Sequence, residues 1–171
     1  MDPLKEHTIP FTGLKDGSHA FTFQLGADFF AAVGDEAFEG GEVDVQVRLD
    51  KTSTMLVTNI HVAGPVRVHC DHCDGLMDLL VKGDQRQIFQ LHGDPDQDDD
   101  ELVTLDPAAH SINLTHYIYE CLRLALPARK VHPAGQCDPE VEKVLDNLTV
   151  EQEHAPDPRW DALKQLKTKR P

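Results

Sequence analysis

The chain has 171 residues, 40% of them hydrophobic and only 6% aromatic, and it carries a formal net charge of −14 at pH 7. This length suits one domain that buries about two thirds of the surface its unfolded chain exposes. A chain this acidic does not bind nucleic acid by bulk attraction, so any RNA contact would be local or would go through a basic protein.

The sequence contains no run of about 18 apolar residues, the length that spans a membrane. Its first ten residues, MDPLKEHTIP, lack the basic start and the apolar run of a secretory signal. We therefore expect a soluble, cytoplasmic protein with no membrane partner. In that reducing compartment, the four cysteines favour metal or thiol chemistry over a disulfide framework.

The first predicted elements are two strands. Residues 19–25 alternate polar and apolar side chains, and residues 41–50 do so most clearly, with Val, Val, Val and Leu on one side. Residues 27–38 are short and less periodic, and they could form one or two helical turns. Residues 50–54, DKTST, then turn the chain.

Three more strands follow, at residues 55–62, 66–70 and 76–91, with β-branched residues enriched in the first. Ala63-Gly64-Pro65 predicts a turn between the first two of these strands. We expect a bulge at Gly83 in the third. The result is an antiparallel meander of about five strands, which could close into a barrel.

Residues 94–101, DPDQDDDE, hold six acidic residues in eight and predict a solvated loop. After this acidic loop the period changes, and residues 111–127 predict an amphipathic helix packed on the sheet. Ser111 or Asn113 would cap this helix, and Pro127 would end it. Its apolar face consists of Leu114, Tyr117, Ile118, Cys121, Leu122 and Ala125.

Asp138-Pro139 and Asp157-Pro158 each place proline directly after a capping residue, which predicts two short further helices. The fold class is therefore α+β. We expect a single α+β domain at 1–148, a linker at 149–156 and a basic helical segment at 157–171.

Cys70 and Cys73 form a C-x-x-C pair in the hairpin loop between two predicted strands, VRVHCDHCDGL. Such a pair offers two thiolates on a tight turn, which is half of a tetrahedral zinc site. It could also be a redox pair, but a thioredoxin-like cysteine needs a helix N-terminus, and the residues after Cys73 predict a strand. The third interpretation is a turn with free, packed cysteines.

The other half of a zinc site would come from His132 and Cys137, which follow the predicted helix. His69 and His72 could replace His132, whereas Cys121 lies on the apolar face of the helix and is expected in the core. Cys70, Cys73, His132 and Cys137 would form a closed Cys₃His set. The zinc would then be structural, because four protein ligands leave no position for a substrate.

The sequence contains no phosphate-binding glycine loop, no G-x-S-x-G and no H-E-x-x-H. We therefore expect no catalytic residues and no small-molecule substrate. The alternative is a thiol–disulfide enzyme that uses Cys70 and Cys73.

Four groups of residues, in the same order and at similar spacing, are similar to those of a known family. They are Cys70-Asp71-His72-Cys73; residues 111–114 with Glu120 and 124–127; Val131-His132 with Cys137; and residues 157–160 with Leu163 and Leu166. From about residue 40 to the C-terminus, the ordered set resembles the YceD-like family, described as large ribosomal RNA subunit accumulation proteins. His72 stands where many members have arginine.

The resemblance implies a non-enzymatic factor that supports accumulation of the large-subunit (23S) ribosomal RNA, in bacteria or plastids. The acidic surface would suit a ribosomal protein or a large-subunit precursor particle. The basic C-terminal segment could contact ribosomal RNA phosphates locally, and its lone tryptophan could stack, anchor a partner or pin the last helix to the core. These candidate residues are Arg159, Trp160, Lys164, Lys167, Lys169 and Arg170. The other alternative is a zinc-stabilised protein–protein adaptor unrelated to ribosomes.

Overall fold

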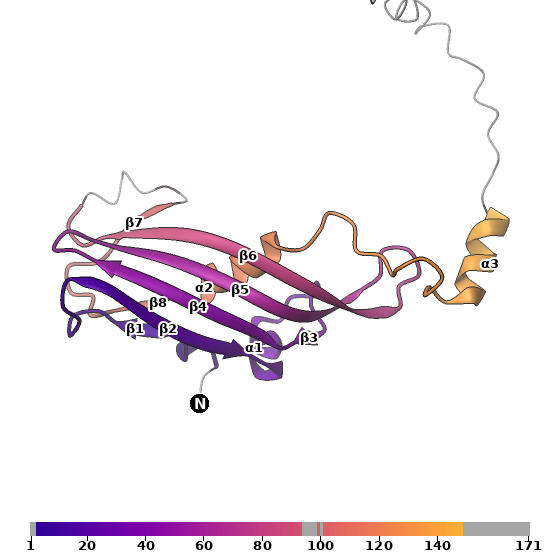
Figure 1. The fold of residues 1–171 in the computed structure, drawn as a ribbon, viewed down its shortest axis with the longest axis horizontal. Helices are drawn as coiled ribbons and strands as arrows, with labels where there is room; N and C mark the ends of the chain where they lie inside the picture. Colours follow the sequence, from indigo (N-terminus) through magenta and orange to yellow (C-terminus); the bar gives the residue numbers. More distant parts are fainter. Residues whose placement is uncertain (1–2, 94–98, 100, 149–171) are drawn as a thin grey trace, which may run out of the picture.

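The structure, a computed structural model, describes residues 3–93, 99 and 101–148. Within these residues the chain is α+β, as predicted, with a six-stranded sheet accompanied by three α-helices (Figure 1). The linker at 149–156, the basic segment at 157–171 and the helix predicted after Asp157-Pro158 lie outside the described residues. No helix among the described residues is long and apolar enough to span a membrane.

The sheet is open and mixed, so the predicted barrel is wrong. Its two edge strands, β2 and β7, do not pair with each other. All neighbours are antiparallel except β6 and β7, because the chain re-enters the sheet in the same direction after residues 94–101. The strands along the sheet are β2 (Gly17–Leu25), β4 (Val43–Lys51), β5 (Met55–His69), β6 (Leu76–Gln90) and β7 (Leu102–Thr104), and β3 (Gly40–Gly41) also pairs with β5.

The turn predicted at Ala63-Gly64-Pro65 is wrong, because β5 continues through it as one 15-residue strand. Here β5 changes neighbours: Ala63 pairs with Asp44 of β4, and Val66 pairs with Gly41 of β3. Proline, which cannot donate to a ladder, is tolerated at such a junction. Gly64 is required by space, since a Cβ there would lie 2.3 Å from the Glu42 carbonyl oxygen.

The bulge predicted at Gly83 is also absent, because the β5–β6 register runs unbroken through the Val62–Gly83 pair. Gly83 instead lets α2 (Thr115–Leu124) approach the sheet closely. A Cβ at Gly83 would lie 3.0 Å from the Cβ of Ala125 and 3.2 Å from the Sγ of Cys121.

The helix predicted at 111–127 is shorter, because its first residues form a strand. β8 (Ser111–Asn113) pairs with β1 (Thr8–Pro10), and α2 begins at Thr115. Asn113, one of the two predicted caps, accepts a hydrogen bond from the Thr115 backbone N–H at 2.9 Å.

The remaining helical elements are short. α1 (Ala27–Val33) confirms the one or two helical turns predicted after the first strand, and its Phe29 and Phe30 are buried. α3 (Pro139–Leu148) confirms the helix predicted after Asp138-Pro139, and the 3₁₀ turn η1 (Pro3–Lys5) precedes β1.

The hydrophobic core lies between α2 and one face of the sheet. The alternation predicted for β4 is observed, with Val43, Val45, Val47 and Leu49 buried. From the other layer, Leu114, Ile118, Cys121 and Leu122 are at most 3% exposed. The core thus holds α2 against β5 and β6, and the position of α2 sets where the chain that follows it can reach.

Candidate metal centre

The hairpin loop between β5 and β6 is a tight turn that brings Cys70 and Cys73 together. The Cys70 N–H donates to the Gly75 carbonyl at 2.9 Å, and the Asp74 N–H donates to the Cys70 carbonyl at 2.9 Å. Asp74 takes the left-handed conformation with φ 59°, which Asp tolerates better than most residues. Gly75 lies directly beside the cluster, since a Cβ there would be 3.4 Å from both Cys73 Sγ and Cε1 of the His132 ring.

The segment after α2 is fastened to this turn by Asp71 and Lys130. The Asp71 N–H donates to the Lys130 carbonyl at 2.7 Å, and the Lys130 N–H donates to the Asp71 carboxylate at 2.6 Å. The Lys130 ammonium adds an ion pair with the same carboxylate at 3.6 Å. These three contacts place His132, two residues further on, next to the two cysteines.

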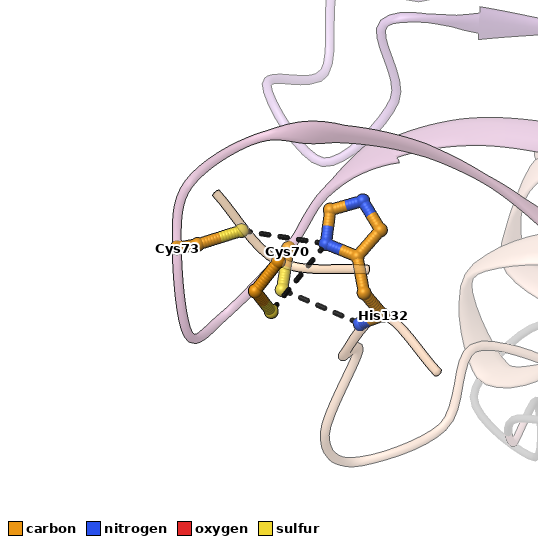
Figure 2. Close-up of side chains that lie close together, drawn as sticks. Cys70, Cys73 and His132 are labelled. Carbon is orange, nitrogen blue, oxygen red and sulfur yellow. Dashed lines mark hydrogen bonds between the residues drawn. The ribbon is translucent and has the colours of Figure 1, made fainter. Parts of the chain in front are cut away.

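Four side chains converge at this point, and they are the four predicted ones. The donor atoms of Cys70, Cys73, His132 and Cys137 all lie within 4.8 Å of one another. Figure 2 shows the Cys73 thiol pointing toward the His132 ring and the Cys70 thiol pointing toward the backbone nitrogen of His132. The His132 Nδ1 is 3.3 Å from Cys73 Sγ and 3.8 Å from Cys137 Sγ, and its backbone N–H donates to Cys70 Sγ at 3.4 Å.

The orientation of His132 is typical of a metal ligand. Its Nδ1 faces the sulfur atoms, while its Nε2 lies 3.3 Å from the Leu76 carbonyl oxygen at the start of β6. Metal-binding imidazoles almost always donate their second N–H to a carbonyl or carboxylate.

The two histidines considered as substitutes for His132 are engaged elsewhere. The His69 ring hydrogen-bonds the Asp74 carbonyl oxygen at 2.7 Å, and His72 lies 3.1 Å from the Glu142 carboxylate.

The electrostatics of the cluster favour thiolates at Cys70 and Cys73. Burial opposes this at Cys70, but backbone N–H groups of the turn and of His132 donate to its sulfur and lower its pKa to about 6. The pKa of Cys73 is lowered first by the backbone N–H of Asp138, at the start of α3. Such N–H donors are the partners that a metal-bound thiolate needs, because they disperse its charge.

The pKa values of the other two donors, Cys137 and His132, are raised. Burial raises the pKa of Cys137 to about 12, and the neighbouring thiols of Cys73 and Cys70 add to the rise. Burial lowers the pKa of His132, but hydrogen bonds to the same two thiols outweigh it and leave that pKa raised. Without a cation, the cluster holds protons to limit its negative charge, so a divalent metal would displace them.

A second contact, which the sequence did not indicate, joins the cluster to α3. His72, Cys137 and Glu142 form a partly overlapping group of three metal-type donors. Glu142 is one of several acids on the short helix predicted after Asp138-Pro139, and nothing in its spacing marks it as a partner of His72, seventy residues earlier.

The local fold lacks the arrangement of a thioredoxin-like pair. β6 follows Cys73, as predicted, so no helix continues directly from the pair, although the start of α3 reaches Cys73 through the Asp138 N–H. Cys70 is 2% exposed, which leaves no path for a substrate disulfide. Cys121 is 3% exposed on α2, and burial raises its pKa to about 11, in keeping with the predicted core position.

The fold and the cluster define a class: an α+β protein whose Cys₃His group ties a β-hairpin to the segment after its core helix. A family model described as large ribosomal RNA subunit accumulation protein YceD matches residues 58–167, well over half of the chain. The chain belongs to this family. Neither the search of curated proteins nor that of solved structures found a match.

Proposed function

We propose that this protein is a non-enzymatic factor that supports accumulation of the large-subunit (23S) ribosomal RNA by binding a ribosomal protein, the RNA or both. The supporting observation is the family match, which runs through the Cys₃His cluster and into the basic C-terminal segment. The proposed place of action is the cytoplasm, where a bacterial large-subunit precursor is assembled.

The cluster is proposed to hold one structural zinc ion. Tetrahedral zinc with thiolate and imidazole ligands places its donor atoms about 3.5 to 3.8 Å apart. The separations from His132 Nδ1 to Cys73 and Cys137, 3.3 and 3.8 Å, need little adjustment to meet that geometry. Because all four ligands come from the protein, the zinc would fix the hairpin, the segment after α2 and the start of α3 relative to one another.

The partner contacts are proposed to divide between two surfaces of opposite charge. The chain as a whole carries a net charge of −14, which suits a basic ribosomal protein. The basic segment concentrates five Lys and Arg residues that could bind RNA phosphates, and its Trp160 could stack on a base.

The test is co-sedimentation with large-subunit precursor particles over a range of salt concentrations. A variant with Gln at Arg159, Lys164, Lys167, Lys169 and Arg170 should bind more weakly, with a shallower salt dependence, because fewer counterions are released. The matched control replaces five exposed basic residues of the body, Lys15, Arg48, Lys82, Arg86 and Arg129, with Gln. Equal binding by the tail variant and the wild type would refute the RNA contact.

One observation favours the alternative of a thiol–disulfide enzyme, namely the lowered pKa of Cys70. That enzyme requires Cys70 to be alkylated rapidly at neutral pH in reduced, metal-free protein. Slow alkylation together with stoichiometric zinc would exclude it. A zinc-stabilised adaptor unrelated to ribosomes would keep the zinc and show no particle association.

A further inference from the structure

α3 carries an apolar stripe, and two of its residues, Val144 and Leu148, are exposed in the described part of the chain. Val141, Val144, Leu145 and Leu148 recur at the spacing of one helix face. No residue of α3 is buried, and Val144 and Leu148 are 57% and 69% exposed. A short amphipathic helix is marginal in water unless its apolar face packs against something.

The described contacts hold α3 from its first turns. The Asp138 N–H donates to Cys73, and Glu142 pairs with His72 at 3.1 Å. Figure 1 shows α3 beyond the end of the sheet, away from α2 and the core. The contacts at the metal centre therefore hold the first turns of α3 but do not cover Val144 and Leu148.

The polar residues of α3 indicate what would cover it. Glu140, Glu142 and Asp146 outnumber the one basic residue, Lys143. An acidic helix with an apolar stripe is complementary to a basic segment with an apolar stripe of its own.

Such a segment follows in the same chain. Trp160, Leu163 and Leu166 are spaced three residues apart, among five Lys and Arg residues and one Asp. Ten residues, 149–158, separate α3 from Arg159, and they can span up to about 33 Å. α3 is only about 15 Å long, so this connection is long enough for the chain to reverse along the helix.

We propose that residues 159–170 cover the apolar stripe of α3 within the same molecule. The tether raises the local concentration of the segment to the order of millimolar, so an external basic segment must outcompete it. The contact would engage Trp160 in the free protein, independently of the ribosomal role. A particle that binds the basic residues would then have to displace them from α3 or bind the side they leave open.

Trp160 is the only tryptophan in the chain, so its fluorescence reports this contact directly. In the full-length protein, Trp160 emission should be blue-shifted and its quenching by acrylamide reduced, relative to a synthetic peptide of residues 157–171. The double variant Val144→Ser/Leu148→Ser should move both signals to the values of the peptide. The matched control, Leu80→Ser/Leu124→Ser, removes two leucines that are 82% and 75% exposed elsewhere and should change neither signal.

Exchanging charges between α3 and the basic segment distinguishes loss of this contact from a general effect on folding. Glu140→Lys/Asp146→Lys should shift Trp160 emission to the red, and adding Lys164→Glu/Lys167→Glu should restore it. Metal content should be the same in all of these variants. Peptide-like Trp160 emission in the wild type, or a blue shift that survives Val144→Ser/Leu148→Ser, would overturn the proposal. A blue shift that disappears on dilution would overturn it in favour of a second copy as the occupant.

Discussion

Metal removal should lower the stability of the protein by an amount that the position of the ligands determines. Cys73 and His132 are 59 residues apart in sequence, so a metal bound to both closes a long loop. In the chain-entropy treatment of cross-links, closing a loop of this length stabilises the fold by about 4 kcal/mol. For a domain of this size, each kcal/mol corresponds to roughly 2–4 °C, so a chelator should lower Tm by about 8–16 °C.

The assay is thermal unfolding, followed by circular dichroism, with and without a strong chelator, combined with elemental analysis of the reduced protein. Cys70→Ser should contain no metal and lose the chelator effect, because a cluster of three donors binds far more weakly. Cys121→Ala is the control, since this cysteine packs in the core 3% exposed and lies outside the cluster. Its Tm should be lower, but its chelator shift should match that of the wild type.

The fold outside the cluster should survive removal of the metal. The core between α2 and the sheet contains none of the four ligands, so metal-free protein should keep its strand signal below the new Tm. Equal Tm values with and without chelator, in protein shown to contain metal, would refute the reasoning. If freshly reduced wild-type protein contains no metal, the cysteines of the cluster are free, packed side chains and not metal ligands.

Three further predictions concern residues of the fold outside the cluster. Leu122→Ala should cost about 2–5 kcal/mol, because the side chain is fully buried, whereas Leu124→Ala, at 75% exposure, should cost less than about 0.5 kcal/mol in urea unfolding. Gly64→Ala should cost about 1–3 kcal/mol, because its Cβ would lie 2.3 Å from a backbone oxygen, and Gly26→Ala, with open space around it, should cost less in the same assay. Burial lowers the pKa of His7 below 6.5, so the unfolded chain binds more protons and the free energy of unfolding should fall as pH drops below about 6.5. His7→Gln should remove that part of the pH dependence, measured as the difference from wild type across a series of urea titrations.

Much of the fold could be predicted because it follows from local periodicity. Buried and exposed residues of β4 alternate from Val43 to Leu49, and the apolar spacing of α2 matches one helix face, so burial against a core fixes both elements. The residues that were misread depend on distant partners. Gly64 and Pro65 have the composition of a turn, but their place in β5 depends on Glu42 and on the change of neighbour from β4 to β3.

The four-donor cluster was predictable for a different reason, namely the scarcity of candidates. Only four cysteines are present, and one of them, Cys121, has a helical apolar neighbourhood that predicts the core. The choice among three histidines was open, since spacing could not separate His132 from His69 and His72. The Asp71–Lys130 connection decides it, and a pair 59 residues apart leaves no trace in a single sequence.

The position of the cluster can be followed back to the packing of α2. Gly83 has no side chain, so Cys121 and Ala125 of the helix region come within van der Waals distance of β6. The chain therefore leaves α2 beside β6, and the two hydrogen bonds between Asp71 and Lys130, one of them to the Asp71 carboxylate, hold it at the end of the hairpin. His132 then meets the first residue of β6 through the Leu76 carbonyl. Each of these steps uses only packing and hydrogen bonds, and the bond from the Asp138 N–H to Cys73 places Cys137 and the start of α3 beside the other three donors in the same way. The fold therefore brings all four donors together without a metal, and a bound metal would lock an arrangement that already exists.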